Sequence, residues 1–70
     1  MSNKAIGEFI KQLRLSKNIS TSEIAKNLTI SEAEYIKCEN GEASIYVDDL
    51  KIIADMLSVK ESELVERYND

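Results

Sequence analysis

The chain has 70 residues, of which 43% are apolar and 31% are charged, and its formal net charge at pH 7 is −4. This length suits one small domain over 1–70, with a single core and no large catalytic cleft. The chain has no histidine and one cysteine, which excludes an imidazole base, an internal disulfide and the usual zinc ligands. It also lacks a glycine-rich phosphate loop, so we expect no enzyme activity, cofactor or metal.

Hydropathy and charge bear on location and partners. The first ten residues, MSNKAIGEFI, lack the apolar stretch of a signal peptide, and no segment reaches the roughly 18 apolar residues of a membrane span. We therefore expect a cytoplasmic protein without a membrane partner. Residues 1–30 carry a net charge of +3 and residues 31–70 a net charge of −7. A positive surface that attracts nucleic acid can form only around the first half.

Apolar residues recur at helical spacing and proline is absent, which predicts an all-α fold of five helices. The first helix is expected over about 3–16, the fourth over about 47–57 and the fifth over about 60–67. Their inward positions are Ile6, Phe9, Ile10, Leu13, Leu50, Ile53, Ala54, Leu57, Leu64 and Val65.

Two capping boxes, STSE at 20–23 and SEAE at 31–34, lie eleven residues apart. In each, the serine hydroxyl accepts from the backbone N–H three residues later, and the glutamate reaches back to the serine N–H. They predict the starts of a second and a third helix. The third would end at Asn40, because Gly41 can take the left-handed conformation without penalty. The inward positions here would be Ile24, Ala25, Leu28, Ile30, Tyr35 and Cys38.

This order of segments resembles the lambda-repressor-like (Xre/Cro-type) helix-turn-helix domain. The resemblance covers 6–65 and rests on the segments IGEFIKQLR, SEIAKNL, ISEAEYIKCENG and LKIIADMLSV. Within the motif, at about 21–40, the aliphatic position is Ile24, and the small residue needed where the two helices cross is Ala25. The resemblance implies a compact five-helix domain that binds DNA.

The resemblance also implies site residues. In such domains the second helix of the motif, here 31–40, lies in the major groove and its first residues contact bases. Carried over position by position, the DNA-binding residues would be Thr21, Ser31, Glu32, Ala33, Glu34, Ile36, Lys37, Asn40, Lys11 and Lys17. Many members also pair an arginine of the first helix with the glutamate that closes the recognition helix. That pair maps onto Arg14 and Glu39, which could instead be unrelated surface charges.

Several residues depart from the pattern of the family, among them Ile45 and Tyr46, which replace the usual proline and capping residue before the fourth helix. Thr21 replaces the usual glutamine, although a threonine hydroxyl can still bond a phosphate. Thr29 replaces the turn glycine and would carry strain of roughly 1 kcal/mol if it kept the left-handed conformation. Glu32 and Glu34 stand at the leading end of the recognition helix, where phosphates repel carboxylates. Glu34 could instead cap the helix, and a glutamate can also accept from the amino group of cytosine.

Several other residues admit purely structural roles. Cys38 could sense redox state, but a lone cysteine on an apolar helical face is more often a core residue. Tyr35 is expected in the core with its hydroxyl at the surface. The acids of the second half, Asp49 among them, are expected to form a solvated face. Ile45 and Tyr46 could form a small dimer patch.

The sequence therefore predicts a sequence-specific, double-stranded DNA-binding protein that regulates transcription, a repressor that acts as a homodimer on a two-fold-related site. The alternative is a helix-turn-helix fold used as a protein-binding, antirepressor-like module without DNA affinity. The acidic second half and the apolar Ile36 on the recognition helix favour this alternative, in which Ile36 would contact a protein partner.

Overall fold

Five α-helices follow one another along the computed structural model, which describes residues 2–69, and these residues form no strand. The helices are α1 (Asn3–Ser16), α2 (Thr21–Ala25), α3 (Glu32–Glu39), α4 (Val47–Leu57) and α5 (Glu61–Asn69). The predicted all-α fold is confirmed, and the bounds of α1 and α4 are those predicted. Helix α5 extends two residues beyond its predicted end and so includes Tyr68.

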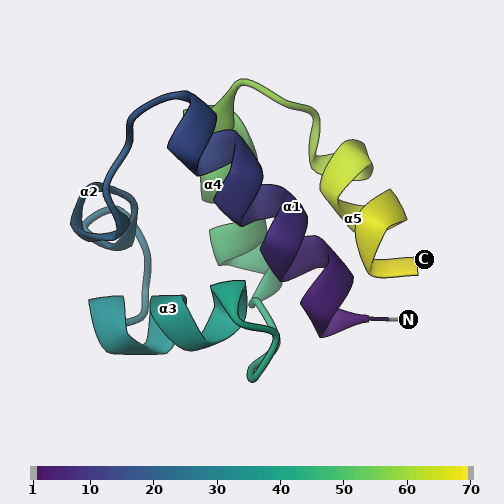
Figure 1. Cartoon of the computed structure of the whole chain (residues 1–70), viewed down its shortest axis with the longest axis horizontal. Helices are drawn as coiled ribbons and strands as arrows, with labels where there is room; N and C mark the ends of the chain where they lie inside the picture. Colours follow the sequence, from purple (N-terminus) through teal and green to yellow (C-terminus); the bar gives the residue numbers. More distant parts are fainter. Residues whose placement is uncertain (1, 70) are drawn as a thin grey trace.

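The helices enclose one core to which all five contribute. Helix α1 packs against α3 and α5, α2 packs against α3, and α4 packs against α5 (Figure 1). The side chains buried most completely are Ile10, Ile24, Tyr35, Ile53, Leu57, Leu64 and Asp49. The two ends of the described chain meet, because the N–H of Ser2 donates to the Tyr68 carbonyl at 2.7 Å. In Figure 1 the two ends lie on one side of α1 and α2 lies on the other, while the last residues of α3 meet the first half of α1 at Gly7.

Local interactions fix where the helices begin and end. Both predicted capping boxes are present, one before α2 and one before α3. Left-handed residues follow three helices: Asn18 follows α1, Gly41 follows α3 and Ser58 follows α4. Glycine adopts this conformation freely and asparagine tolerates it, so the predicted stop at Gly41 is confirmed.

The turn between α2 and α3 differs from expectation at Thr29. This residue does not adopt the left-handed conformation, so the expected strain is absent. Its N–H and hydroxyl donate to Oδ1 and Oδ2 of Asp49, at 2.9 and 2.7 Å. Asp49 is 0% exposed, and the expectation that it lies on a solvated face is wrong. A buried carboxylate needs such donors, and here they tie the turn to the first turn of α4.

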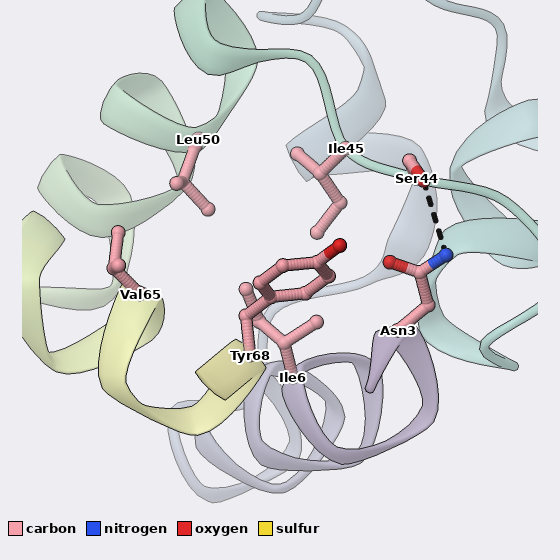
Figure 2. A pocket seen from close by; sticks show the side chains of 7 residues that line it. All are labelled: Asn3, Ile6, Ser44, Ile45, Leu50, Val65 and Tyr68. Atoms are coloured by element: carbon pink, nitrogen blue, oxygen red, sulfur yellow. Dashed lines mark hydrogen bonds between the residues drawn. The ribbon is translucent and has the colours of Figure 1, made fainter. Parts of the chain in front are cut away.

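An apolar pocket of about 160 Å³ opens between α1, α5 and the segment that leads into α4 (Figure 2). Its lining residues are Asn3, Ile6, Ser44, Ile45, Leu50, Val65 and Tyr68. The ring of Tyr68 lies inside it beside Ile6, and Asn3 Nδ2 donates to Ser44 Oγ at 3.0 Å. Val65, expected to point inward, lines this pocket but remains 41% exposed.

Candidate nucleic-acid interface

Helix α3 has an inner face and an outer face. On the inner face Tyr35, Cys38 and Glu39 are buried, as α3 packs against α1 and α2. The outer face consists of the exposed residues Glu32, Ala33, Glu34, Ile36, Lys37 and Asn40. In Figure 1, α3 runs along the lower edge of the molecule with no other helix below it. The α3 residues that the resemblance assigns to DNA therefore share one accessible surface.

The C-terminal end of α3 is anchored to α1 by a buried ion pair. Arg14 donates from Nε to Glu39 Oε2 at 2.6 Å and from Nη2 to Glu39 Oε1 at 3.1 Å. Its Nη1 donates to the carbonyl of Ile19 at 2.9 Å. The hydrogen bond to Glu39 raises the pKa of Arg14 above its ordinary value. The pair implied by the resemblance is thus present and lies inside the fold, away from the outer face.

Tyr35 belongs to the same buried cluster. It is 0% exposed and its hydroxyl donates to Oε2 of Glu39. Burial, and then the hydrogen bond to Glu39, raise the pKa of Tyr35 far above its ordinary value of 10.0. The expectation of a surface hydroxyl is wrong, because the carboxylate of Glu39 provides an acceptor for it in the interior.

A second anchor is the close approach of α1 to α3 at Gly7. A Cβ atom at this position would lie 2.5 Å from the carbonyl oxygens of both Cys38 and Glu39. Real Cβ contacts are never this short, so glycine is what allows the two backbones to meet here. The contact joins Gly7 to residues 31 and 32 positions later, and no local pattern in the sequence marks Gly7 for this role.

The leading end of α3 is closed by its own side chains. Glu34 Oε1 accepts from the N–H and from the hydroxyl of Ser31, both at 3.1 Å, and Ser31 Oγ accepts from the N–H of Glu34 at 3.2 Å. The negative charge of Glu34 also lies at the positive end of the helix dipole. Ser31 and Glu34 are therefore engaged with each other before any ligand arrives.

Glu32 is held differently, by a contact across the turn. The hydroxyl of Thr21 donates to Glu32 Oε2 at 2.7 Å, which links the start of α2 to the start of α3. Thr21 was expected to bond a phosphate, and such a bond would compete with the one it makes to Glu32. The sequence offered no sign of this contact, because the two residues belong to different capping boxes.

Lysines on α1, on α3 and at the helix ends are available to bind phosphate. Lys37 belongs to the outer face, Lys17 and Lys26 are exposed, and Lys11 is half-buried on α1. Arg14–Glu39 is the one ion pair found within residues 2–69, so these lysines have no carboxylate partner in the described structure. Free ammonium groups of this kind are what phosphate oxygens require.

Cys38 lies behind the outer face rather than on it. Its thiol donates to the Ser44 carbonyl at 3.7 Å, and burial raises its pKa above the ordinary value. A protonated, buried thiol is a poor nucleophile, so the role of Cys38 as a core residue is favoured over redox sensing. A shallow groove of about 290 Å³ lies beside it, between α3 and the loop after Gly41. Lys37, Glu42 and Tyr46 are among the residues that line this groove.

Within residues 2–69, no cluster of three or more His, Cys, Asp or Glu side chains is arranged to hold a metal ion. No helix in this range combines the length and apolar character that crossing a membrane requires.

Comparison with known proteins identifies the family. Residues 10–64 match the model of the HTH_3 family, described as helix-turn-helix. The fold is similar to the crystal structure of the clp gene regulator ClgR from Corynebacterium glutamicum, with a TM-score of 0.83. The two are 16% identical, and the similarity covers 96% of this chain and 71% of that chain, which shows a shared fold. No curated protein matches the sequence. The family match covers most of the chain, which belongs to the lambda-repressor-like helix-turn-helix family HTH_3.

Proposed function

We propose that the protein binds double-stranded DNA by placing α3 in the major groove, and that it represses transcription from the sites it occupies. The observation that carries this proposal is the division of α3 into two faces. The inner face is fixed to α1 through Gly7 and the Arg14–Glu39 pair, while the outer face is uncovered. An α-helix held in this way fits the major groove and presents its first residues to base edges.

The proposed contacts divide into two kinds. Ala33 and Ile36 are apolar and offer van der Waals contact to base edges, of which the thymine methyl group is the best suited. Lys37, Lys17 and Lys11 offer ammonium groups to phosphates, and Asn40 offers an amide beside the end of α3. With this few lysines and a net charge of −4, we expect weaker nonspecific binding than for a basic domain.

Homodimer formation is part of the proposal. Two-fold-related half-sites are bound by two copies whose recognition helices are about 34 Å apart. Tyr46 is 64% exposed and Val47 is 74% exposed, and both follow the half-buried Ile45. The exposure of Tyr46 and Val47 just before and at the start of α4 supports the use of this segment as a contact between copies. A protein that acts on DNA in this way is expected in the cytoplasm.

The test is a selection of random duplexes with the purified protein, after circular dichroism has shown that it is helical. We expect a two-fold-symmetric motif with half-sites about one helical turn apart. The affinity of a selected duplex should fall with salt at a slope of about −0.9 for each phosphate contact. Sedimentation should find two protein copies per duplex. Absence of enrichment at low salt, with folded protein, would reject DNA binding.

A second candidate function is protein binding through the same fold, without DNA. The observation that favours it is Ile36, an apolar residue that is 40% exposed at the flank of the outer face. Replacing Ile36 by serine separates the two functions. A protein-binding module would lose its partner, whereas a DNA-binding protein would keep its symmetric motif and lose only preference at one base position.

A further inference from the structure

We infer that the two acids at the leading end of α3 have different roles, and that Glu32 is a base-reading residue that accepts a hydrogen bond from the amino group of a cytosine in each half-site. Glu34 reads no base. The inference rests on the proposed function, since it requires α3 to lie in the major groove. It assigns a base class to one position of the operator, which the family alone does not provide.

Glu34 is excluded as a base reader by its hydrogen bonds. Its Oε1 accepts from both the N–H and the hydroxyl of Ser31, and this closes the capping box at the start of α3. Its Oε2 accepts no hydrogen bond from residues 2–69, so Glu34 differs from Glu32 in being folded back on its own helix and not in lacking an open oxygen. Turning the carboxylate toward a base would leave the Ser31 N–H without its acceptor and would remove a negative charge from the positive end of the helix. Each loss disfavours the reorientation, so the side chain remains folded back on the helix.

Glu32 has one oxygen held and one oxygen open. Oε2 accepts from the Thr21 hydroxyl at 2.7 Å, and Oε1 accepts no hydrogen bond from residues 2–69. The residue is the first of α3 and is exposed. The hydrogen bond to Thr21 limits the rotation of a flexible side chain, so the open oxygen points in a restricted range of directions. Thr21 is therefore a positioning residue for Glu32.

The chemistry of a carboxylate then selects the base. An ionised carboxylate only accepts hydrogen bonds, and the donors in the major groove are the amino groups of cytosine and adenine. Adenine presents the N7 acceptor next to its amino group, and guanine and thymine present acceptors, all of which repel a carboxylate. Cytosine alone offers a donor without an acceptor on the same base. A carboxylate drawn out of water without a donor is costly, so Glu32 acts mainly by rejecting wrong bases.

The experiment is a parallel duplex selection with four proteins: the wild type, Glu32→Gln, Glu34→Gln and Thr21→Val. Glu34→Gln is the matched control, because it removes the same unit charge two residues away and glutamine still closes a capping box. Thr21→Val removes the hydroxyl while keeping the shape of the side chain. Each selected motif is followed by affinity measurements on duplexes that carry each of the four bases at every half-site position.

The wild type is expected to prefer cytosine by about tenfold or more at one position of each half-site. In Glu32→Gln this preference should fall at least severalfold, while the affinity for the other bases rises. Glu34→Gln should retain the preference. Thr21→Val should weaken it at the same position, because the carboxylate is still present but less well oriented.

Three results would overturn the inference. If Glu32→Gln binds the same motif with unchanged base preferences, the inference fails and the proposed function stands. If Glu34→Gln loses the preference as fully as Glu32→Gln, the effect is one of net charge and the inference fails again. If the folded wild type enriches no duplex at any salt concentration, the proposed function falls and the inference falls with it.

Discussion

The guanidinium of Arg14 meets the carboxylate of Glu39 through two hydrogen bonds, one at 2.6 Å and one at 3.1 Å, inside the fold. Arg14 comes from the last turn of α1, and Glu39 is the last residue of α3. The pair therefore fixes the recognition helix to the longest helix of the domain without using any residue of the outer face. Its loss should affect stability first and DNA binding only as a consequence.

Replacing only one residue of this pair should lower the free energy of unfolding far more than the pair's full removal would suggest, because the other charge is left buried. Arg14→Met leaves a buried carboxylate and Glu39→Met leaves a buried guanidinium, and each should cost about 3–5 kcal/mol of unfolding free energy. The double variant leaves no uncompensated charge and should lose much less than the two single losses added together. Urea unfolding of the four proteins closes the double-mutant cycle. Additive losses would show that the two side chains contribute independently.

Tyr35 should make stability sensitive to alkaline pH. Its folded pKa lies above the unfolded value of 10.0, so its contribution is complete below pH 10.0 and declines as the pH rises beyond that value. The decline approaches about 1.4 kcal/mol per pH unit for one group. Urea midpoints measured from pH 8 to 11.5 should fall more steeply for the wild type than for Tyr35→Phe. Parallel curves would mean that the tyrosine ionises equally in both states.

The neighbouring acids Asp48 and Asp49 provide a matched test of burial. Asp49→Ala removes both acceptors of Thr29 and should cost roughly 2–4 kcal/mol, since each bond to a charged group contributes about 1.5–3 kcal/mol before any relaxation. Asp48→Ala changes an exposed residue of the same helical turn and should stay within about 0.5 kcal/mol of the wild type. Thermal unfolding measures the loss of stability in each of the two variants. Equal effects would mean that the turn does not depend on Asp49.

The contrast between these two acids shows which features the sequence could reveal. Apolar spacing predicted the bounds of α1 and α4, and the two capping boxes predicted the starts of α2 and α3. Each of these signals is local, because the residues that form it lie within a few positions of one another. The burial of Asp49 depends on Thr29, 20 positions earlier. Nothing in the local sequence distinguishes Asp49 from the exposed aspartate next to it, Asp48.

The same limit applies to the candidate interface. The inward positions Tyr35 and Cys38 indicated which side of the recognition helix faces outward, because residues three apart lie on one face of a helix. They could not indicate that Thr21 bonds to Glu32 or that the Tyr35 hydroxyl turns inward to Glu39. Those contacts depend on side-chain directions across a turn or within a buried cluster. The capping box already set Glu34 apart from Glu32 in the sequence, and the contact with Thr21 adds that one oxygen of Glu32 is held across the turn.

Gly7→Ala should be strongly destabilising although alanine is the better helix former. The added Cβ would overlap the carbonyl oxygens of Cys38 and Glu39, so the helices must move apart at a cost of about 1–3 kcal/mol or more. The control is Glu8→Ala, an exposed change in the same turn of α1 that should be nearly neutral. Urea midpoints compare the two variants. A neutral Gly7→Ala would mean that α3 can shift without loss.

Lys37→Ala should weaken DNA binding without altering stability. If Lys37 contacts a phosphate, affinity should fall on every duplex and the salt slope should become shallower by about 0.9. Lys60→Ala is the charge-matched control, because Lys60 lies in the connection between α4 and α5, across the molecule from α3 (Figure 1). Fluorescence anisotropy at several salt concentrations measures both quantities. Equal losses in the two variants would point to net charge alone.

The anchors of α3, at Gly7 and Arg14, both act on its last residues, whereas Glu32 lies at the opposite end, about 10 Å away along the helix axis. This buried support at the last residues sets the tilt of the helix, while the exposed Thr21–Glu32 hydrogen bond joins its first residue to α2. A tilt of about 6° at the support would move the reading end by about 1 Å, a large displacement on the scale of a hydrogen bond. Substitutions that slightly reshape this buried support would thus change which DNA sequences the protein prefers, without touching any residue that meets a base.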